Sequence, residues 1–107
     1  MFVVFDIGTS RLKVSAFSAT GQLLGQVTKR HSQYVEKEFS WQDTREWWSN
    51  ACTGFANLMQ ENALDQKAIR GFSVCGRAGA GVFVDKSGQV IAEPWSDARH
   101  RPLLRGL

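Results

Sequence analysis

Apolar and polar residues alternate over short distances in the first third of the chain, a pattern typical of β-strands. An apolar run at residues 2–5 predicts a buried strand that ends at Asp6. Partial alternation over residues 12–17, followed by a turn signal at 19–21, predicts a second strand antiparallel to the first. Residues 23–35 mix β-branched and aromatic residues with polar ones, so we expect a third, more exposed strand of an antiparallel meander.

The hydrophobic period lengthens in the middle of the chain to that of an α-helix. Asp43 followed by Glu46 resembles a capping box, a common start of a helix. Apolar side chains then recur at helical spacing, at Trp48, Cys52, Phe55 and Met59. We therefore expect one helix over residues 44–63 that packs on the sheet, with Trp47 and Trp48 contributing to the packing.

Short extended segments follow the predicted helix. Residues 69–74 form a strand candidate that runs into a glycine-rich stretch at 75–81. Residues 82–84 precede a turn at 85–88 and a last extended piece at 90–91. The crossover through the helix places the 69–74 strand parallel to the first strand, which predicts a mixed α/β sheet.

Length and composition narrow the class of protein. A chain of 107 residues has room for one domain, and 43% apolar residues with two prolines indicate a packed core rather than disorder. The apolar run from Met1 to Phe5 is too short for a signal peptide or a membrane helix, so we expect a cytoplasmic protein with no membrane partner. Cys52 and Cys75 lack metal-binding spacing, and we expect both thiols to be reduced.

The net charge of +3 has a local origin. Arg99, Arg101 and Arg105 follow the last acid, Asp97, so residues 1–98 are neutral overall. A nucleic-acid-binding surface needs basic residues spread along a face and interleaved with aromatic ones, whereas this excess is a terminal cluster. We therefore expect no nucleic-acid partner.

The most informative local chemistry lies at the end of the first predicted strand. Gly8 allows the backbone to approach phosphate oxygens, and Thr9 and Ser10 can donate hydrogen bonds to them. Lys13 supplies a point charge, and Asp6 could hold a magnesium ion or its water. An ordinary hairpin turn has the same composition, so local chemistry alone leaves both interpretations open, and the pattern is not that of a Walker loop.

Four segments resemble one known family. Residues 6–13 resemble the opening phosphate motif of the actin-like ATPase superfamily and, within it, of the FGGY carbohydrate kinases. Residues 41–48 resemble the segment ahead of that family's first helix, and residues 71–88 resemble its sugar-side strand and hairpin. Residues 95–99 match its Trp-x-Asp-x-Arg signature. The segments occur in the family's order over residues 2–99, and the resemblance implies an α/β, ribonuclease-H-like fold.

The resemblance also implies an activity. Members of the family use ATP and magnesium to phosphorylate a sugar or polyol between two ribonuclease-H-like domains. Residues 1–107 would then be the N-terminal portion of the first, sugar-side domain, an incomplete domain that ends in the start of a helix at 101–104. The second domain and the catalytic base are expected in sequence beyond Leu107, so we expect no catalytic residue in this chain and no turnover by it alone.

Individual roles follow from the resemblance. Asp6 is assigned to the magnesium or phosphate environment, and the phosphates are assigned to Gly8, Thr9, Ser10 and Lys13. Arg11 stands where many relatives carry a small residue, so it either adds charge toward the phosphates or turns outward into solvent.

The sugar-side residues depart from the family pattern. Residues 75–81 replace a Ser-Gly-Gln-Met-His-Gly run of xylulose-kinase-like members, and Arg77 is the one strong hydrogen-bonding side chain left. Arg77 either binds sugar hydroxyls or an acidic substrate, or it lies in solvent. Asp97 and Arg99 could orient polyol hydroxyls beside an apolar wall formed by Trp95. Without the family match, Trp95 would be a core residue and the other two a surface pair.

Other function classes fit parts of the chain. A ribonuclease-H-like nuclease needs several carboxylates around two metals, and the strand after the helix ends at residues 74–76 without an acid. A non-catalytic interaction module or remnant would leave a half-sheet exposed, and its apolar surface would favour self-association. His31 and His100 lack partners at catalytic or metal spacing, so we expect both at the surface, and Cys75 is either inert or near the substrate.

Overall fold

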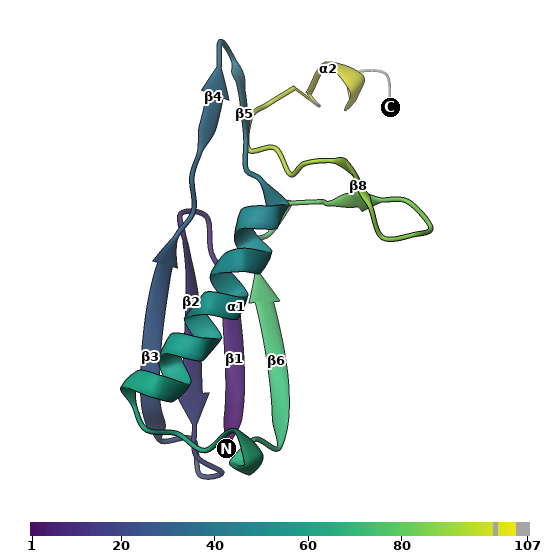
Figure 1. The fold of residues 1–107 in the computed structure, drawn as a ribbon. Coiled ribbons are helices and arrows are strands. Elements are labelled where there is room, and N and C mark those ends of the chain that lie inside the picture. Colours follow the sequence, from purple (N-terminus) through teal and green to yellow (C-terminus); the bar gives the residue numbers. More distant parts are fainter. Residues whose placement is uncertain (100, 105–107) are drawn as a thin grey trace. The chain divides into compact units, whose positions relative to one another are not determined.

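The computed structural model describes residues 1–99 and 101–104, and for residues 103 and 104 only the backbone (Figure 1). The expectation that His100 is a surface residue therefore lies outside the described residues. The chain divides into two compact units, which we describe separately. The first unit comprises residues 1–31 and 45–78, and the second comprises residues 32–44 and the described residues from 79 onward.

A four-stranded mixed sheet forms the first unit. Its strands are β1 (Phe2–Ile7), β2 (Arg11–Phe17), β3 (Leu23–Arg30) and β6 (Gly71–Gly76), in the order β3-β2-β1-β6. The first three form an antiparallel meander and β6 lies parallel to β1, as predicted. β1 continues through Asp6, which corrects the expected strand end, because Asp6 pairs with Lys13 on one side and with Cys75 on the other.

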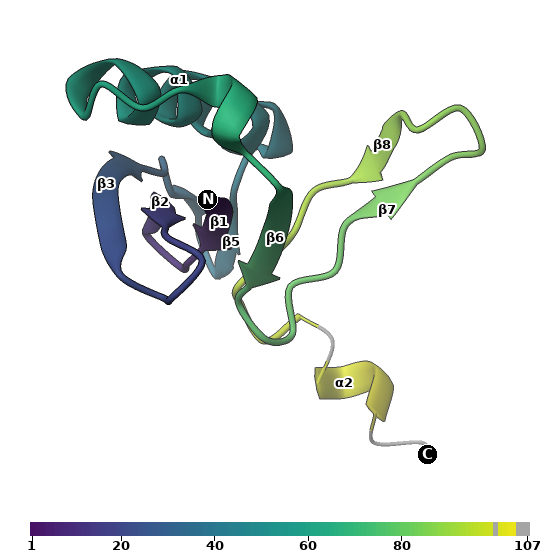
Figure 2. The same ribbon diagram turned by 90° about the horizontal axis from the view of Figure 1, so that it is seen from below.

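One long helix, α1 (Thr44–Glu61), covers one face of this sheet (Figure 2). It begins directly after Asp43, as predicted, and ends ahead of Ala63, whose left-handed backbone (φ 50°) cannot continue the helix. The buried residues that pack between helix and sheet are Val3, Leu12, Val14, Ala16, Val27, Leu58 and Met59. A short 3₁₀ helix at Gln66–Ala68 connects α1 to β6. None of the helices in the described part of the chain is both long enough and apolar enough to span a bilayer.

The predicted helix face was partly wrong. Trp48 is 74% exposed and Cys52 is exposed, whereas Gly54 lies on the buried side of α1. A Cβ added at Gly54 would lie 2.9 Å from Val14 Cγ2, so the absence of a side chain lets the helix approach β2 closely. Trp48 lies instead on the flank of α1 toward β6, where no further described element of this unit covers it.

The third predicted strand divides into two elements. β3 ends at Arg30, and β4 (Tyr34–Glu36) pairs with β5 (Phe39–Trp41) in a separate antiparallel hairpin of the second unit. Lys37 adopts a positive φ of 54° in the connecting turn. A lysine carries none of the usual glycine or asparagine signal for such a turn, which explains why the pattern predicted one continuous strand.

The rest of the second unit contains a second hairpin and a short helix. β7 (Phe83–Val84) pairs with β8 (Val90–Ala92), which confirms the predicted turn at residues 85–88. The Asp85 carboxylate accepts hydrogen bonds from Ser87 and from the Gln89 N–H, and these contacts hold the turn closed. The helix α2 (Arg101–Leu104) follows, as expected.

Candidate functional site

The turn between β1 and β2 is closed by its own backbone. The Gly8 N–H donates to the Arg11 carbonyl at 2.9 Å. A Cβ at Gly8 would lie 2.9 Å from the same oxygen, so a side chain there would open the turn. Thr9 and Ser10 lie exposed at its tip. The four residues from Gly8 to Arg11 thus form a tight, solvent-facing loop, which we call the phosphate turn after the role that the sequence predicts for it.

An ion pair lies directly below the phosphate turn. Lys13 Nζ is 3.7 Å from Asp6 Oδ2, and both side chains are about half exposed. Alternation along β1 and β2 places this pair on the face of the sheet opposite α1, because Val3 and Leu12 fill the other face. A pair exposed to this degree contributes little to stability, so both groups stay available for a ligand.

Cys75 lies beside this pair on β6, in register with Asp6. Desolvation, followed by the charge of the neighbouring Asp6 carboxylate, raises the pKa of Cys75. A raised pKa disfavours the thiolate, so Cys75 is a weak nucleophile. Both cysteines of the chain are free thiols, as expected.

His31 is a site residue that the sequence did not reveal. It is 8% exposed, which contradicts the expected surface position, and its backbone N–H donates to the Ser10 carbonyl at 3.0 Å. Its ring packs on Trp47 at 5.8 Å between centroids, and Nδ1 lies 3.4 Å from Asn50 Nδ2. Because the neighbours of His31 in sequence are polar, no pattern signals that its side chain turns toward α1.

The surroundings of His31 favour its neutral form. Burial lowers the pKa of His31, Glu46 opposes that shift, and the Arg77 guanidinium adds to it. Nε2 is buried and has no hydrogen-bond partner among the described residues. Protonation at Nε2 would therefore place an unpaired charge in the interior, next to the phosphate turn.

Arg77 lies at the same end of the first unit as the phosphate turn. Its backbone N–H donates to the Ile7 carbonyl at 3.0 Å, which extends the β1–β6 pairing by one residue beyond β6. Its side chain is half-buried. The first unit therefore brings together Asp6, the phosphate turn, Lys13 and Arg77.

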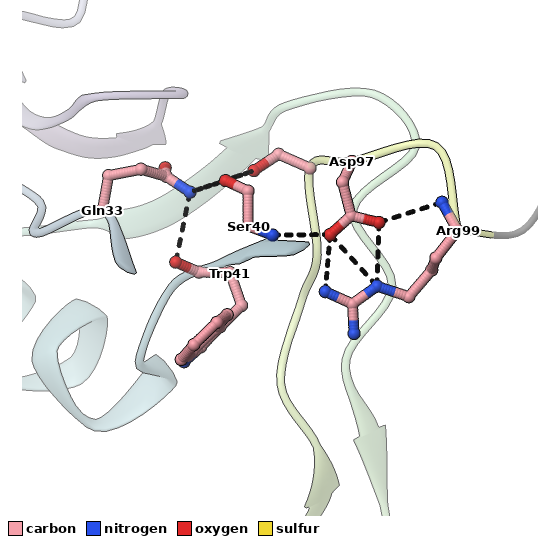
Figure 3. A network of polar contacts seen from close by, with 6 residues as sticks. Gln33, Ser40, Trp41, Asp97 and Arg99 are labelled. Carbon is pink, nitrogen blue, oxygen red and sulfur yellow. Dashed lines mark hydrogen bonds and ion pairs between the residues drawn. The ribbon is translucent and has the colours of Figure 1, made fainter. Parts of the chain in front are cut away.

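The remaining candidates lie in the second unit, around the carboxylate of Asp97 (Figure 3). Asp97 Oδ2 accepts from the Ser40 N–H at 2.6 Å, and Oδ1 accepts from the Arg99 N–H at 2.9 Å and from Arg99 Nε at 2.8 Å. The side chain of Asp97 is 8% exposed. The hydrogen bonds from the Arg99 side chain, ahead of those from the backbone, hold the pKa of Asp97 far below its usual range.

Two glutamines act on this carboxylate indirectly, through Ser40, and no sequence motif indicates either of them. Gln33 Nε2 donates to the Trp41 carbonyl and to Ser96 Oγ, both at 3.1 Å, and also to Ser40 Oγ. Gln42, which is 1% exposed, donates from Nε2 to Gln33 Oε1 at 2.9 Å. The network fixes the position of Ser40, whose N–H holds Asp97. Its members are common polar residues, so only the fold reveals that they meet.

Aromatic rings enclose the guanidinium of Arg99. Its Cζ lies 4.8 Å from the centroid of Phe39 and 5.7 Å from that of Trp95. Trp95 in turn stacks on Phe83, with centroids 5.9 Å apart and ring planes 2° from parallel. Cation–π contacts and the Asp97 carboxylate thus hold Arg99 in one orientation. Both carboxylate oxygens of Asp97 already accept hydrogen bonds from Ser40 or Arg99. The groups best placed to contact a ligand are therefore Trp95 and Arg99.

The described residues contain no group of three or more His, Cys, Asp or Glu side chains that could hold a metal ion. Magnesium usually keeps several waters and takes one or two carboxylates together with phosphate oxygens. Asp6, half exposed beside the phosphate turn, fits that requirement as a single carboxylate.

The sequence of the chain is similar to those of carbohydrate kinases, both in a family model and in individual proteins. The model of the N-terminal domain of the FGGY family of carbohydrate kinases matches residues 1–107. A xylulose kinase of Staphylococcus epidermidis is 30% identical over 98 residues, which cover 89% of this chain and 20% of that protein. A xylulose kinase of Bacillus subtilis is 28% identical over 100 residues, 91% of this chain and 20% of that protein. The chain thus spans about a fifth of the length of these relatives.

Solved structures share the fold. A gluconate kinase from Lactobacillus acidophilus superposes with a TM-score of 0.85 at 13% identity, over 98% of this chain and 21% of that one. A xylulose kinase from Rhodospirillum rubrum gives a TM-score of 0.81 at 20% identity, over 97% and 22%. These likenesses confirm the predicted α/β, actin-like ATPase fold, present here as an incomplete domain.

Proposed function

Because the chain belongs to the FGGY family of carbohydrate kinases, we propose that it carries phosphate-binding and sugar-binding elements of an ATP-dependent sugar or polyol kinase. The reaction would move the γ-phosphate of ATP to a carbohydrate hydroxyl. The observation that supports this best is the phosphate turn, closed by Gly8 and set above the Asp6–Lys13 pair. In this proposal residues 1–107 form part of the sugar-side domain, and the catalytic base lies outside them.

The phosphate turn would position the transferred group. Phosphoryl transfer depends mainly on alignment and on neutralising charge at the phosphate oxygens. The Lys13 ammonium would supply that charge, and the exposed Thr9 and Ser10 would donate hydrogen bonds to the same oxygens. Gly8 keeps the turn tight, so these donors stay close together.

Asp6 is the residue we assign to magnesium. When bound, the ion would neutralise phosphate charge. Asp6 would hold it directly or through a water, using the carboxylate whose Oδ2 now lies 3.7 Å from Lys13 Nζ. The phosphates would offer Lys13 a second anionic partner, so Asp6 could turn toward the cation without leaving the ammonium unpaired.

In the second unit, we assign sugar recognition to the residues around the Asp97 carboxylate. We assign the apolar C–H face of the substrate to Trp95 and hydroxyl recognition to Arg99, whose guanidinium is fixed by Phe39 and Asp97. Asp97 would act mainly by orienting Arg99, because Ser40 and Arg99 already donate to both of its oxygens. In the first unit, the candidate for substrate recognition is Arg77, whose guanidinium could donate to hydroxyls or to an acidic group.

A cytoplasmic location is part of the proposal, because the reaction that we assign uses ATP as the phosphoryl donor. The two free and exposed thiols, Cys52 and Cys75, suit a reducing compartment, where exposed cysteines persist unpaired.

The test is a chimera in which residues 1–107 replace the matching segment of the Staphylococcus epidermidis xylulose kinase. We expect ATP-dependent phosphorylation of a sugar or polyol, measured by coupled release of ADP over a panel of pentoses, hexoses, gluconate and glycerol. Asp6→Asn and Lys13→Met should each lower kcat by about 10²-fold or more. Lys86→Met, in the exposed β7–β8 turn, is the matched control and should change kcat less than about twofold. Equal activity of all three variants in a folded chimera would contradict the proposal.

A second candidate function is a non-catalytic module that associates with its own copies. An apolar groove of about 440 Å³ lies between α1 and β6, and its lining includes Trp48, Phe72 and Val74. Among the described strands, β6 pairs with β1 alone, so its outer edge carries unpaired backbone N–H and C=O groups. The exposed side chains of Phe72 and Val74 lie on the same strand. Light scattering should then give a dimer mass that Val74→Lys reduces to a monomer. A monomer at high concentration would exclude this candidate.

A further inference from the structure

Two arginines face each other across neighbouring strands of the first unit. Arg11 at the start of β2 is in register with Arg30 at the end of β3. Side chains directly opposite on antiparallel strands lie on the same face, with Cβ atoms about 4.5–5.5 Å apart, and like charges in that position repel. Neither guanidinium has a hydrogen bond, ion pair or ring contact among the described residues. The pair is therefore uncompensated in the structure.

The face on which these arginines lie follows from the strand alternation. Val14 and Val27 are also opposite each other, and both are buried on the α1 side of the sheet. Arg11 and Arg30 lie an odd number of positions away from them, so their side chains occupy the other face, together with that of Lys13. Three cations thus share one end of this face.

The acidic residues do not balance these cations. Along the four strands, the single acid on this face is Asp6, and it already pairs with Lys13. Three cations against one acid leave two positive charges. Both belong to the arginine pair.

Arg11 is the last residue of the phosphate turn, and Arg30 lies opposite it on β3. The Arg11 carbonyl accepts the Gly8 N–H at 2.9 Å, the bond that closes the turn. Arg30 precedes His31, whose N–H donates to the Ser10 carbonyl at 3.0 Å. Each arginine is therefore fixed to the turn through its own backbone or that of the next residue.

We propose that Arg11 and Arg30 form an anion subsite that binds phosphate oxygens beside those held by Thr9 and Ser10 of the phosphate turn. The inference rests on the proposed function of that turn and adds a second group of donors to it. Two planar guanidinium groups can each bind a phosphate through paired hydrogen bonds, and an anion between them removes their repulsion. The phosphate would belong either to the polyphosphate chain of a nucleotide or to a phosphorylated sugar.

The experiment uses the full 107-residue chain, labelled with ¹⁵N and titrated with inorganic tripolyphosphate. We expect saturable shifts of the Arg11 and Arg30 Nε–Hε signals and of the Thr9 and Ser10 amides. Arg11→Gln and Arg30→Gln should each weaken binding about fivefold to tenfold, as expected for loss of one charge-assisted contact. Arg70→Gln is the matched control, because Arg70 is exposed at the other end of the sheet, where its N–H donates to the Met1 carbonyl. The affinity of this variant for tripolyphosphate should equal that of the original chain.

A melting experiment separates this role from a structural one. Without an anion, Arg11→Gln and Arg30→Gln should melt at the same temperature as the original chain or above it, because each removes a repulsive contact. Tripolyphosphate should raise the melting temperature of the original chain more than that of either variant. Variants that melt earlier without ligand would show that the guanidiniums have a structural role, and would overturn the subsite.

Ligand choice identifies the source of the phosphate. Tripolyphosphate binding at least tenfold tighter than ribose 5-phosphate would assign the subsite to the nucleotide tail, and the reverse order would assign it to a phosphorylated sugar. Arginine shifts without any shift of the Thr9 and Ser10 amides would support the subsite while contradicting the proposed role of the turn. Turn shifts with unchanged affinity of both arginine variants would overturn the subsite and leave the proposed function standing. No shift at either place would overturn both.

Discussion

The close contact between α1 and β2 makes a quantitative prediction for Gly54→Ala. Replacing glycine by alanine in the middle of a helix normally stabilises the helix by about 1 kcal/mol. Here the new Cβ would lie 2.9 Å from Val14 Cγ2, with Lys29 Cγ at 3.6 Å and Leu12 Cδ2 at 3.9 Å. Val14 and Leu12 are fully buried, so neither can move aside freely, and overpacking of this kind costs about 1–3 kcal/mol.

The net effect should be a loss of up to about 2 kcal/mol in the free energy of unfolding, centred near 1 kcal/mol. Urea denaturation followed by circular dichroism would measure it, and the melting temperature should fall by about 4–8 °C per kcal/mol. Ala56→Gly, on the exposed side of the same helix, isolates the propensity term and should cost about 1 kcal/mol. The steric reasoning would be refuted if Gly54→Ala raised the free energy of unfolding by as much as Ala56→Gly lowered it.

Three further predictions concern the polar groups. The folded chain has a lowered pKa at His31, so below pH 6.5 the unfolded chain binds more protons than the folded one, and the free energy of unfolding should fall on acidification. The fall should be smaller in His31→Phe, and equal pH profiles of the two proteins would contradict a buried neutral imidazole. Gln42→Leu leaves Gln33 Oε1 without its donor and should cost about 1–3 kcal/mol in urea denaturation, whereas no change would show that the network is dispensable. Calorimetry of the 107-residue chain with Mg-ATP and sugars should show only weak nucleotide binding and no turnover, and tight binding with steady product formation would contradict the assignment of the catalytic base to sequence outside residues 1–107.

Alternation and turn signals predicted the sheet of the first unit well. Leu12, Val14 and Ala16 alternate with polar residues, and only one register buries all three against a helix. The boundaries were less predictable where a turn lacks its usual residues. Lys37 closes the β4–β5 hairpin in a conformation that lysine rarely adopts, and no local pattern announces it.

The orientation of α1 depends on a contact rather than on a pattern. Trp48 has the right helical spacing for the core, yet the helix approaches the sheet through Gly54, which carries no hydrophobic signal. Periodicity identifies a helix and its apolar side, but the exact line of contact depends on which neighbouring strands are present. For Trp48 the described part of this unit provides none beyond β6.

The candidate site was predictable in chemistry and only partly in geometry. Asp6 and Lys13 are seven positions apart, and a hairpin places such residues opposite each other, so their pairing follows from the turn. His31 could not be found in this way, because its burial depends on Trp47 and α1, which lie far along the chain. The same holds for Asp97 and Ser40, whose hydrogen bond joins residues 57 positions apart.

That long separation between Asp97 and Ser40 has a consequence for the order of events on the ribosome. The first unit has all its strands once residue 78 has emerged, and its contacts within the meander are local, so it can fold early. The β4–β5 hairpin has been synthesised by then, but the carboxylate that anchors Ser40 is still missing. The second unit must therefore wait for Asp97, and a pause in translation before that codon would delay the second unit without delaying the first.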